Sequence, residues 1–190
     1  MYATLGTINT GQAYLFDKAI EASRGQPWQM VISVGRHLNL SRWTRVPENV
    51  LVRNYVPQPA LLRQVQAVIS RGGMNTVTET LAAGVPLGVA PAGADQFEAA
   101  RRVVEAGAGL RLSLQKAKVE ELTNIIRHLL EKPGFRENAQ RIAKDYAKCD
   151  GPSTATALIL RLTEKRAPLL RPTGRRATIY ANEAVEIRSP

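Results

Sequence analysis

The chain is poor in features that would tie it to a disulfide framework, a membrane or the secretory route. It has one cysteine, Cys149, among 190 residues, so no internal disulfide can form, and a domain of this length buries a core without one. No apolar run approaches the roughly 18–20 residues that span a bilayer, and the first residues do not read as a signal peptide. We therefore expect a cytoplasmic protein without a transmembrane segment.

Aromatic and acidic residues are also scarce. Aromatics make up 5% of the chain, and 26 Lys and Arg face 16 Asp and Glu, which leaves a formal charge of +10. Such an excess favours an anionic partner: a nucleic acid, an acidic membrane surface or a phosphorylated small molecule. A nucleic-acid-binding protein usually concentrates its charge on one face beside aromatic stacking partners. Neither feature is visible, so we expect a basic soluble enzyme domain with no nucleic-acid partner.

What the chain does have is a regular alternation of short apolar runs and amphipathic stretches, with glycine at many of the turns. The expected strands are residues 2–5, 29–34, 50–52, 67–70, 87–90 and 109–112. The expected helices are residues 13–23, 59–65, 75–83, 95–106, 119–130, 133–148 and 153–165. This order predicts an α/β fold, a Rossmann-like doubly wound parallel sheet with helices on both faces.

A doubly wound sheet binds ligands beyond the carboxyl ends of its strands, where loops lead into helices. The predicted loops at that edge are residues 6–11, 35–40, 55–58, 71–75 and 91–96. After residue 165 prolines interrupt the helical pattern. We therefore expect one domain over residues 1–165 and a basic tail over residues 166–190 that is extended or disordered.

The loop after the fourth predicted strand has the composition of a phosphate-binding turn. Gly72 and Gly73 allow the backbone to approach a ligand closely, and the next helix offers free N–H groups and the positive end of its dipole. Arg71 adds a permanent charge that can bridge two phosphate oxygens, and Asn75 and Thr76 add side-chain donors. The alternative is an ordinary tight turn in which Asn75 caps the helix.

Two further positions place polar groups near this loop. Glu79 follows Asn75 by one helical turn, so it shares a helix face with the loop, where a carboxylate can accept hydrogen bonds from ribose hydroxyls. Asp95 and Gln96 open the next helix, and each can hold two sugar hydroxyls. The simpler interpretations are a solvent-exposed glutamate and an acidic helix start. Spacing alone does not separate these alternatives.

Three stretches, taken in order, resemble the donor site of the family 1 UDP-glycosyltransferases. They are residues 54–62 (Asn-Tyr-Val-Pro-Gln-Pro-Ala-Leu-Leu), residues 70–86 with Arg-Gly-Gly-Met-Asn-Thr, and residues 91–96 (Pro-Ala-Gly-Ala-Asp-Gln). The triplets at residues 5–7 (Leu-Gly-Thr) and 34–36 (Val-Gly-Arg) are similar as well. The likeness runs over roughly residues 1–165 and is nearest to the bacterial macrolide and carotenoid glycosyltransferases. It implies the C-terminal half of a GT-B glycosyltransferase.

The resemblance implies a role in donor binding for each matching residue. The residues implied to bind the base are Tyr55, Val56 and Gln58. The residues implied to bind the diphosphate are Thr7, Arg71, Gly73, Asn75 and Thr76. Glu79 is implied to bind the ribose, and Asp95 and Gln96 the transferred sugar. No metal or cofactor is implied, because cationic and amide donors would stabilise the leaving diphosphate.

The implied function is that of the donor half of an inverting glycosyltransferase, which moves a hexose from a nucleoside-diphosphate sugar, with UDP-sugar favoured, to a small-molecule acceptor. Two departures limit it. The family usually has His where this chain has Arg71, so Arg71 either contacts the diphosphate or turns outward. The family's preceding acceptor-binding domain, which carries the general base, has no counterpart here. We therefore assign no catalytic residue.

The expected partner is such an acceptor-binding domain, either in cis or as a separate chain. The alternative is a non-catalytic binding or interaction module derived from a donor domain, which cannot turn over without an acceptor domain.

Overall fold

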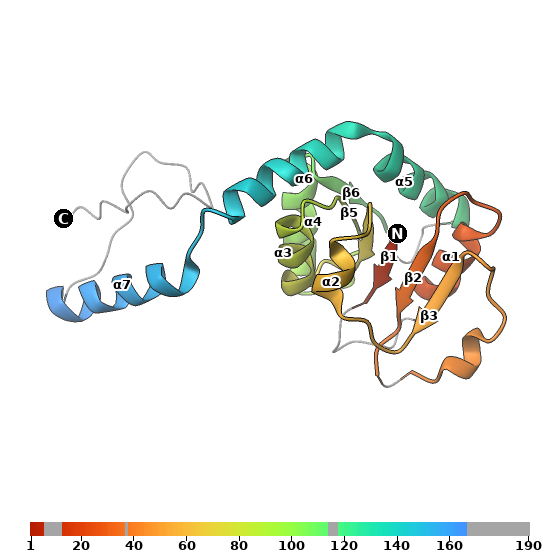
Figure 1. The fold of residues 1–190 in the computed structure, drawn as a ribbon, viewed down its shortest axis with the longest axis horizontal. Coiled ribbons are helices and arrows are strands. Elements are labelled where there is room, and N and C mark those ends of the chain that lie inside the picture. Colours follow the sequence, from red (N-terminus) through yellow and green to blue (C-terminus); the bar gives the residue numbers. More distant parts are fainter. Residues whose placement is uncertain (6–12, 37, 114–117, 167–190) are drawn as a thin grey trace. The chain divides into compact units, whose positions relative to one another are not determined.

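The computed structural model describes residues 1–5, 13–36, 38–113 and 118–166, which build one parallel sheet (Figure 1). Its strands are β1 (Tyr2–Thr4), β2 (Met30–Ser33), β3 (Val50–Arg53), β4 (Val68–Ser70), β5 (Leu87–Val89) and β6 (Gly109–Arg111). The order is β3-β2-β1-β4-β5-β6, so the chain winds outward from β1 to one edge and then crosses to β4 and the other edge. This confirms the predicted doubly wound sheet.

Helices cover both faces of the sheet. One face lies under α1 (Tyr14–Ser23) and α5 (Val119–Glu131), which pack against each other. The other lies under α2 (Gln58–Leu62), α3 (Met74–Ala82) and α4 (Gln96–Glu105). The predicted elements are all present, with ends that differ by a few residues. The 3-10 helix η1 (Leu40–Trp43), between β2 and β3, was not predicted.

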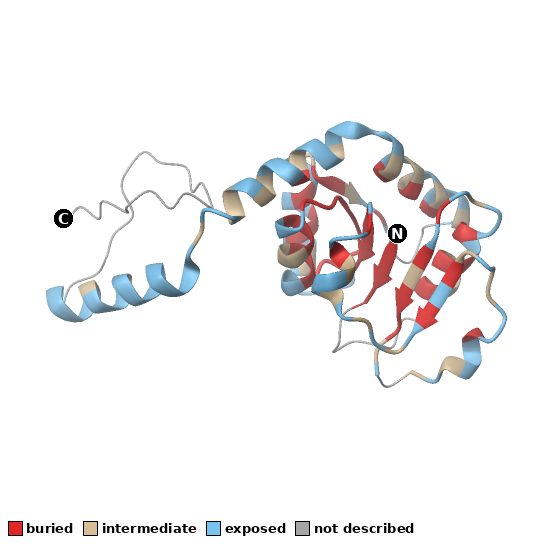
Figure 2. Ribbon diagram, viewed as in Figure 1, coloured by how far each residue is buried: buried red, intermediate tan, exposed pale blue. Residues whose placement is uncertain are grey.

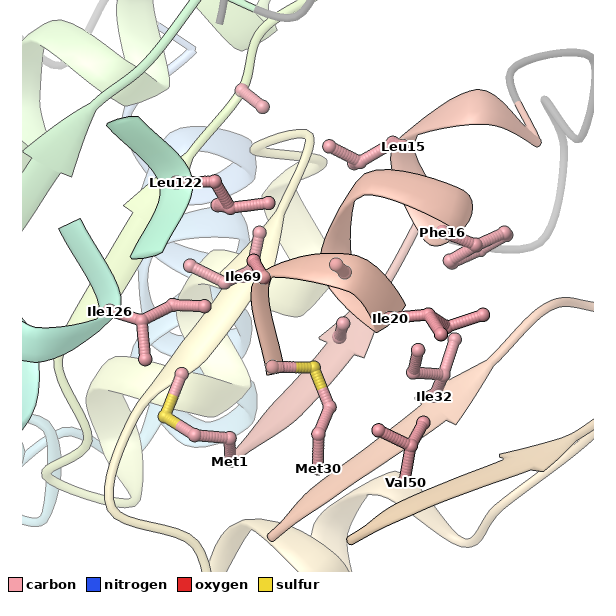
Figure 3. Close-up of a cluster of buried hydrophobic side chains, with 14 of the residues drawn as sticks. Met1, Leu15, Phe16, Ile20, Met30, Ile32, Val50, Ile69, Leu122 and Ile126 are labelled. Carbon is pink, nitrogen blue, oxygen red and sulfur yellow. The ribbon is translucent and has the colours of Figure 1, made fainter. Parts of the chain in front are cut away.

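The face under α1 and α5 carries the larger apolar core (Figure 3). Phe16 and Ile20 of α1 and Leu122 and Ile126 of α5 are buried in one cluster with Ile69 of β4. Each such side chain contributes about 1.5–3 kcal/mol on burial. These helices therefore supply much of the free energy that holds the sheet together.

The opposite face has a smaller apolar cluster, made by Tyr2, Leu62, Val65, Val68 and Val85. Alternation along the strands places hydroxyl side chains on this face as well. The buried hydroxyl residues of the strands and of α3 are Thr4, Ser33, Ser70, Thr76 and Thr80. This face is thus the more polar one, and its polar groups gather toward the carboxyl ends of the strands.

The chain divides into two compact units, Met1–Ala143 and the residues from Lys144 onward. In the first, α6 (Pro133–Tyr146) buries Ala139, and the Nδ2 of Asn138 donates to the carbonyl of Gly107, just after α4, at 3.2 Å. In the second, α7 (Gly151–Lys165) has no buried residue (Figure 2). No helix within the described ranges is long and apolar enough to cross a membrane. The predicted tail lies outside the described residues after Arg166, and its boundary stays a prediction.

Candidate functional site

The loops that follow β2 and β3 are joined by Asn54. Its Nδ2 donates to the carbonyl of Gly35 at 3.0 Å and to the carbonyl of Leu38 at 2.7 Å. These bonds hold the turn that carries Tyr55 against the loop that carries Arg36. The guanidinium of Arg36 lies 5.0 Å from the centre of the Tyr55 ring.

Tyr55 presents an aromatic face at the carboxyl edge of the sheet. It is 60% exposed, and the guanidinium of Arg36 lies over its ring. A planar ring with a cation over it suits the stacking of another flat ring. The sequence points to Arg36 only as part of a similar triplet. It does not predict the pairing of Arg36 with Tyr55, because nothing in the spacing links the two loops.

The residue after this turn, Gln58, contacts the helix that carries Glu79. The Nε2 of Gln58 donates to Oε2 of Glu79 at 2.8 Å, and the Oε1 of Gln58 accepts from the hydroxyl of Tyr2 at 3.1 Å. The resemblance implied base binding for Gln58 and ribose binding for Glu79. The structure joins the two side chains, so the parts of the edge predicted to hold base and ribose are adjacent.

The glycine loop after β4 is tight on one side and open on the other. Gly72 has φ of +87°, and a Cβ there would lie 2.6 Å from Cγ1 of Val89 and 3.3 Å from the carbonyl oxygen of Gln96. No larger residue fits without displacement. At Gly73 no described residue other than its chain neighbours has an atom within 4 Å of the position of a Cβ, so this part of the structure leaves room for a ligand there.

The N-cap residue of the helix that this loop begins is a glycine, which has no side chain to cap it. α3 starts at Met74 with Gly73 as its N-cap residue, so the alternative in which Asn75 caps the helix is wrong. Asn75 instead lies exposed within the first turn. The first N–H groups of a helix have no partner within it, and they carry the positive end of its dipole. The arrangement therefore suits a phosphate.

Arg71 lies at the base of this loop rather than turning outward. It is 4% exposed. Burial lowers the pKa of its guanidinium, and the nearby phenol of Tyr14 on α1 opposes that shift. An arginine stays charged under these conditions, so a fixed positive charge is buried near α1, in the residue that precedes the two glycines. Thr76 is 8% exposed and lies on the inner side of α3.

The loop after β5 ends at Asp95 and Gln96. The Oε1 of Gln96 accepts from the backbone N–H of Ala92 at 2.9 Å, which closes the loop on itself. Ala94 has φ of +51°, a left-handed conformation that is uncommon for a residue with a Cβ. Asp95 is exposed at the N-cap position and makes no capping bond to α4.

The next carboxylate along the chain is engaged elsewhere. Hydrogen bonds from Arg101 and Arg102 lower the pKa of Glu98 to about 2. Asp95 is therefore the carboxylate that this loop offers to a ligand.

Thr7, which the resemblance assigned to the diphosphate, lies outside the described residues. Over the described ranges there is no group of three or more His, Cys, Asp or Glu side chains that could hold a metal ion.

Comparison with known proteins gives a consistent picture. Residues 29–161 match the family model described as the C-terminal domain of erythromycin biosynthesis protein CIII-like proteins. The chain is 30% identical over 166 residues to the uncharacterized UDP-glucosyltransferase YojK of Bacillus subtilis, covering 87% of this chain and 41% of that protein. It is 34% identical over 159 residues to 4'-demethylrebeccamycin synthase of Lentzea aerocolonigenes, covering 84% and 37%.

A solved structure is similar as well. The spinosyn rhamnosyltransferase SpnG complexed with thymidine diphosphate matches with a TM-score of 0.71 and 28% identity, over 86% of this chain and 45% of that one. The chain thus spans about two fifths of the length of these relatives.

Proposed function

The chain belongs to the family of erythromycin biosynthesis protein CIII-like C-terminal domains, the Rossmann-like half of GT-B glycosyltransferases, and we propose that it binds a nucleoside-diphosphate sugar as the donor half of such an enzyme. The favoured donor is a UDP-sugar, and the group transferred is a hexose, with inversion at its anomeric carbon. The acceptor is a small molecule. The acceptor half, which would precede this domain or come as a separate chain, is the expected partner.

The observation that carries the proposal is the open start of α3, which has a glycine as its N-cap residue and follows a buried arginine in the chain. Gly73 leaves the backbone accessible, and Arg71 supplies a charge that no pH change within the physiological range removes. In a reaction of this class the bond between the anomeric carbon and the diphosphate oxygen breaks, and negative charge grows on the diphosphate. Helix N–H groups and a guanidinium held in place would stabilise that charge without a metal.

The neighbouring side chains support the remaining parts of the donor. Tyr55 and Arg36 offer a stacking surface for the base, and Glu79 a carboxylate for ribose hydroxyls. Asp95 and Gln96 lie on the loop that touches Gly72 and are proposed to bind the sugar. The new bond forms from an acceptor hydroxyl, whose proton goes to a base on the acceptor half.

Isothermal titration of the folded chain with UDP tests the proposal directly. We expect saturable heat in the micromolar-to-millimolar range, weaker binding of UMP, which lacks the second phosphate, and no transfer to any acceptor by the chain alone. A parallel titration with dTDP decides between the two nucleotides. Folded protein that gives no heat with millimolar UDP or dTDP would contradict donor binding and would leave the interaction-module alternative.

A further inference from the structure

Tyr2 stands out among the buried polar groups because it is far from the edge in sequence and yet reaches the site. It belongs to β1 and is 2% exposed. Its side chain lies on the same face of the sheet as that of Thr4, and its hydroxyl reaches Gln58 at the carboxyl edge. There it meets Oε1 of Gln58 at 3.1 Å. Neither the motifs nor the family resemblance assigns Tyr2 a role.

Two hydrogen bonds link Tyr2 to Gln58 and Gln58 to Glu79, and the direction of each follows from Glu79. An ionised carboxylate only accepts hydrogen bonds, so the end of Gln58 that faces Oε2 of Glu79 must be the NH2 group. The other end, the carbonyl oxygen, then faces Tyr2, and the phenol must donate. The carboxylate of Glu79 thereby selects one of the two orientations of the Gln58 amide, and the Tyr2 hydroxyl holds the amide from its other end.

We propose that Tyr2 is a positioning residue of the nucleotide site, which acts through Gln58 to hold the carboxylate of Glu79 in the orientation that receives the ribose hydroxyls. The inference rests on the proposed donor binding and deepens it. Gln58 engages Oε2 of Glu79 and leaves Oε1 without a protein partner among the described residues. Without the Tyr2 hydroxyl the Gln58 amide loses one of its two anchors, and its bond to the carboxylate is held less firmly.

The groups around the Tyr2 hydroxyl favour a phenol that keeps its proton. Burial raises the pKa of Tyr2; hydrogen bonds with Thr4 and Ser33 offset part of that rise, and the charges of Glu79 and Tyr55 add to it. The donor that Gln58 requires is therefore present throughout the physiological range. Because the group is inside the face that α2 and α3 cover, its contribution is little screened by solvent.

The test is Tyr2→Phe, which removes one oxygen and keeps the ring. Its two ligands are UDP and the 2′,3′-dideoxy analogue of UDP, which has neither ribose hydroxyl. We expect the Kd for UDP to rise about tenfold, the size of a weakened hydrogen bond to a charged group, while the Kd for the analogue changes less than twofold. An equal rise of the Kd for both ligands, or an unchanged Kd for UDP, would overturn the positioning role.

A control separates this effect from a loss of stability. Ser23→Ala removes another fully buried hydroxyl, one that donates to the carbonyl of Ala19 at 2.9 Å and accepts from Trp28. We expect a comparable fall in melting temperature and an unchanged Kd for UDP. If Ser23→Ala weakens UDP binding as much as Tyr2→Phe does, the effect of Tyr2 is general and the positioning role is wrong.

A double-mutant cycle asks whether Tyr2 acts through Glu79. In a Glu79→Ala background Tyr2→Phe should leave the Kd for UDP unchanged. If the two substitutions change the free energy of UDP binding additively, Tyr2 does not act through Glu79. Should Tyr2→Phe fail to fold, Gln58→Met removes the same hydrogen bonds at a half-buried position. It should raise the Kd for UDP more than the Kd for the dideoxy analogue. If the unaltered chain binds neither nucleotide, the proposed donor binding is wrong. If it binds both and the substitutions leave the ratio of the two Kd values unchanged, only the positioning role of Tyr2 is wrong.

Discussion

The two faces of the sheet contrast in what they bury. Under α1 and α5 the strands present mainly aliphatic side chains to a continuous core, whereas under α2 and α3 they present hydroxyls and the tyrosine that reaches the site beside aliphatic side chains such as Val68. The same six strands serve both faces, because successive residues point to opposite sides. The comparison indicates that one face mainly supports the fold, and that the other gives up part of its apolar packing to hold polar groups in place.

The sharpest way to break this contrast is to open a cavity in the apolar face. Ile126 is fully buried between α5 and the sheet, so Ile126→Ala should lower the free energy of unfolding by about 3 kcal/mol. Urea denaturation measures that loss. At a temperature where the variant is folded, its Kd for UDP should stay within twofold of the unaltered chain. A much larger change would mean that the two faces are energetically coupled.

The complementary change removes a site carboxylate from the polar face. Glu79→Ala should raise the Kd for UDP by about 10- to 150-fold, since a hydrogen bond to a charged group is worth about 1.5–3 kcal/mol. It should alter stability by less than about 1 kcal/mol because Glu79 is only half-buried. Glu98→Ala on α4, whose carboxylate pairs with Arg101 and Arg102, is the matched control. Equal effects of the two substitutions on calorimetric titrations would remove Glu79 from the site.

A smaller effect comes from exchanging the buried cation for one that titrates. Arg71→His introduces the residue that the family usually has, and its imidazole loses its charge as the pH rises through about 6.5. We expect the ratio of the variant's Kd for UDP to that of the unaltered chain to grow from near one at pH 5.5 to about tenfold at pH 8. Measuring both proteins at each pH cancels the titration of UDP itself. A constant ratio would show that Arg71 does not act on the diphosphate.

The smallest expected effect concerns a hydroxyl that the polar face does not use. Thr80 on α3 is fully buried, and its Oγ1 has no hydrogen-bond partner within the described residues. Thr80→Val should therefore raise the free energy of unfolding by about 0.5–1 kcal/mol and leave UDP binding unchanged. Thr123→Val on α5 is the counterpart, because Thr123 donates to the carbonyl of Val119 at 3.0 Å. It should destabilise, and a gain in stability there would undermine the explanation for Thr80.

Most of the fold was predictable because its signals are local. Apolar runs of strand length and glycines such as Gly107 at the ends of helices marked the elements before any tertiary contact was known, and Gly107 does adopt φ of +64° after α4. The 3-10 helix Leu40–Trp43 was not predicted because contacts distant in sequence hold Trp43 in place. Its ring packs edge-to-face on Phe16, and its Nε1 donates a hydrogen bond to Oδ1 of Asp17 at 2.8 Å. No periodicity within four residues indicates such a turn.

The candidate site was predictable as a set of loops but not as a set of contacts. The glycines and the polar residues at 71–79 pointed to a phosphate-binding turn, and the structure shows a helix there with a glycine as its N-cap residue. The sequence left open whether Arg71 turns into solvent, and the structure buries it; its contact with the diphosphate stays a prediction. The stacking of Arg36 on Tyr55 and the bond of Gln58 to Glu79 join residues 19 and 21 positions apart, and the sequence has no feature that pairs them.

The amino-acid sequence by itself determined the alternation of strands and helices, the open glycine loop and the residue types available at the carboxyl edge, because each depends on near neighbours along the chain. Only the tertiary structure decided which of those residues meet. Tyr2 illustrates the reason: its position in β1 marks it as an ordinary buried aromatic. The parallel pairing of β1 with β2 and β4, and the packing of α2 and α3 over that face, bring its hydroxyl to Gln58 and through it to Glu79.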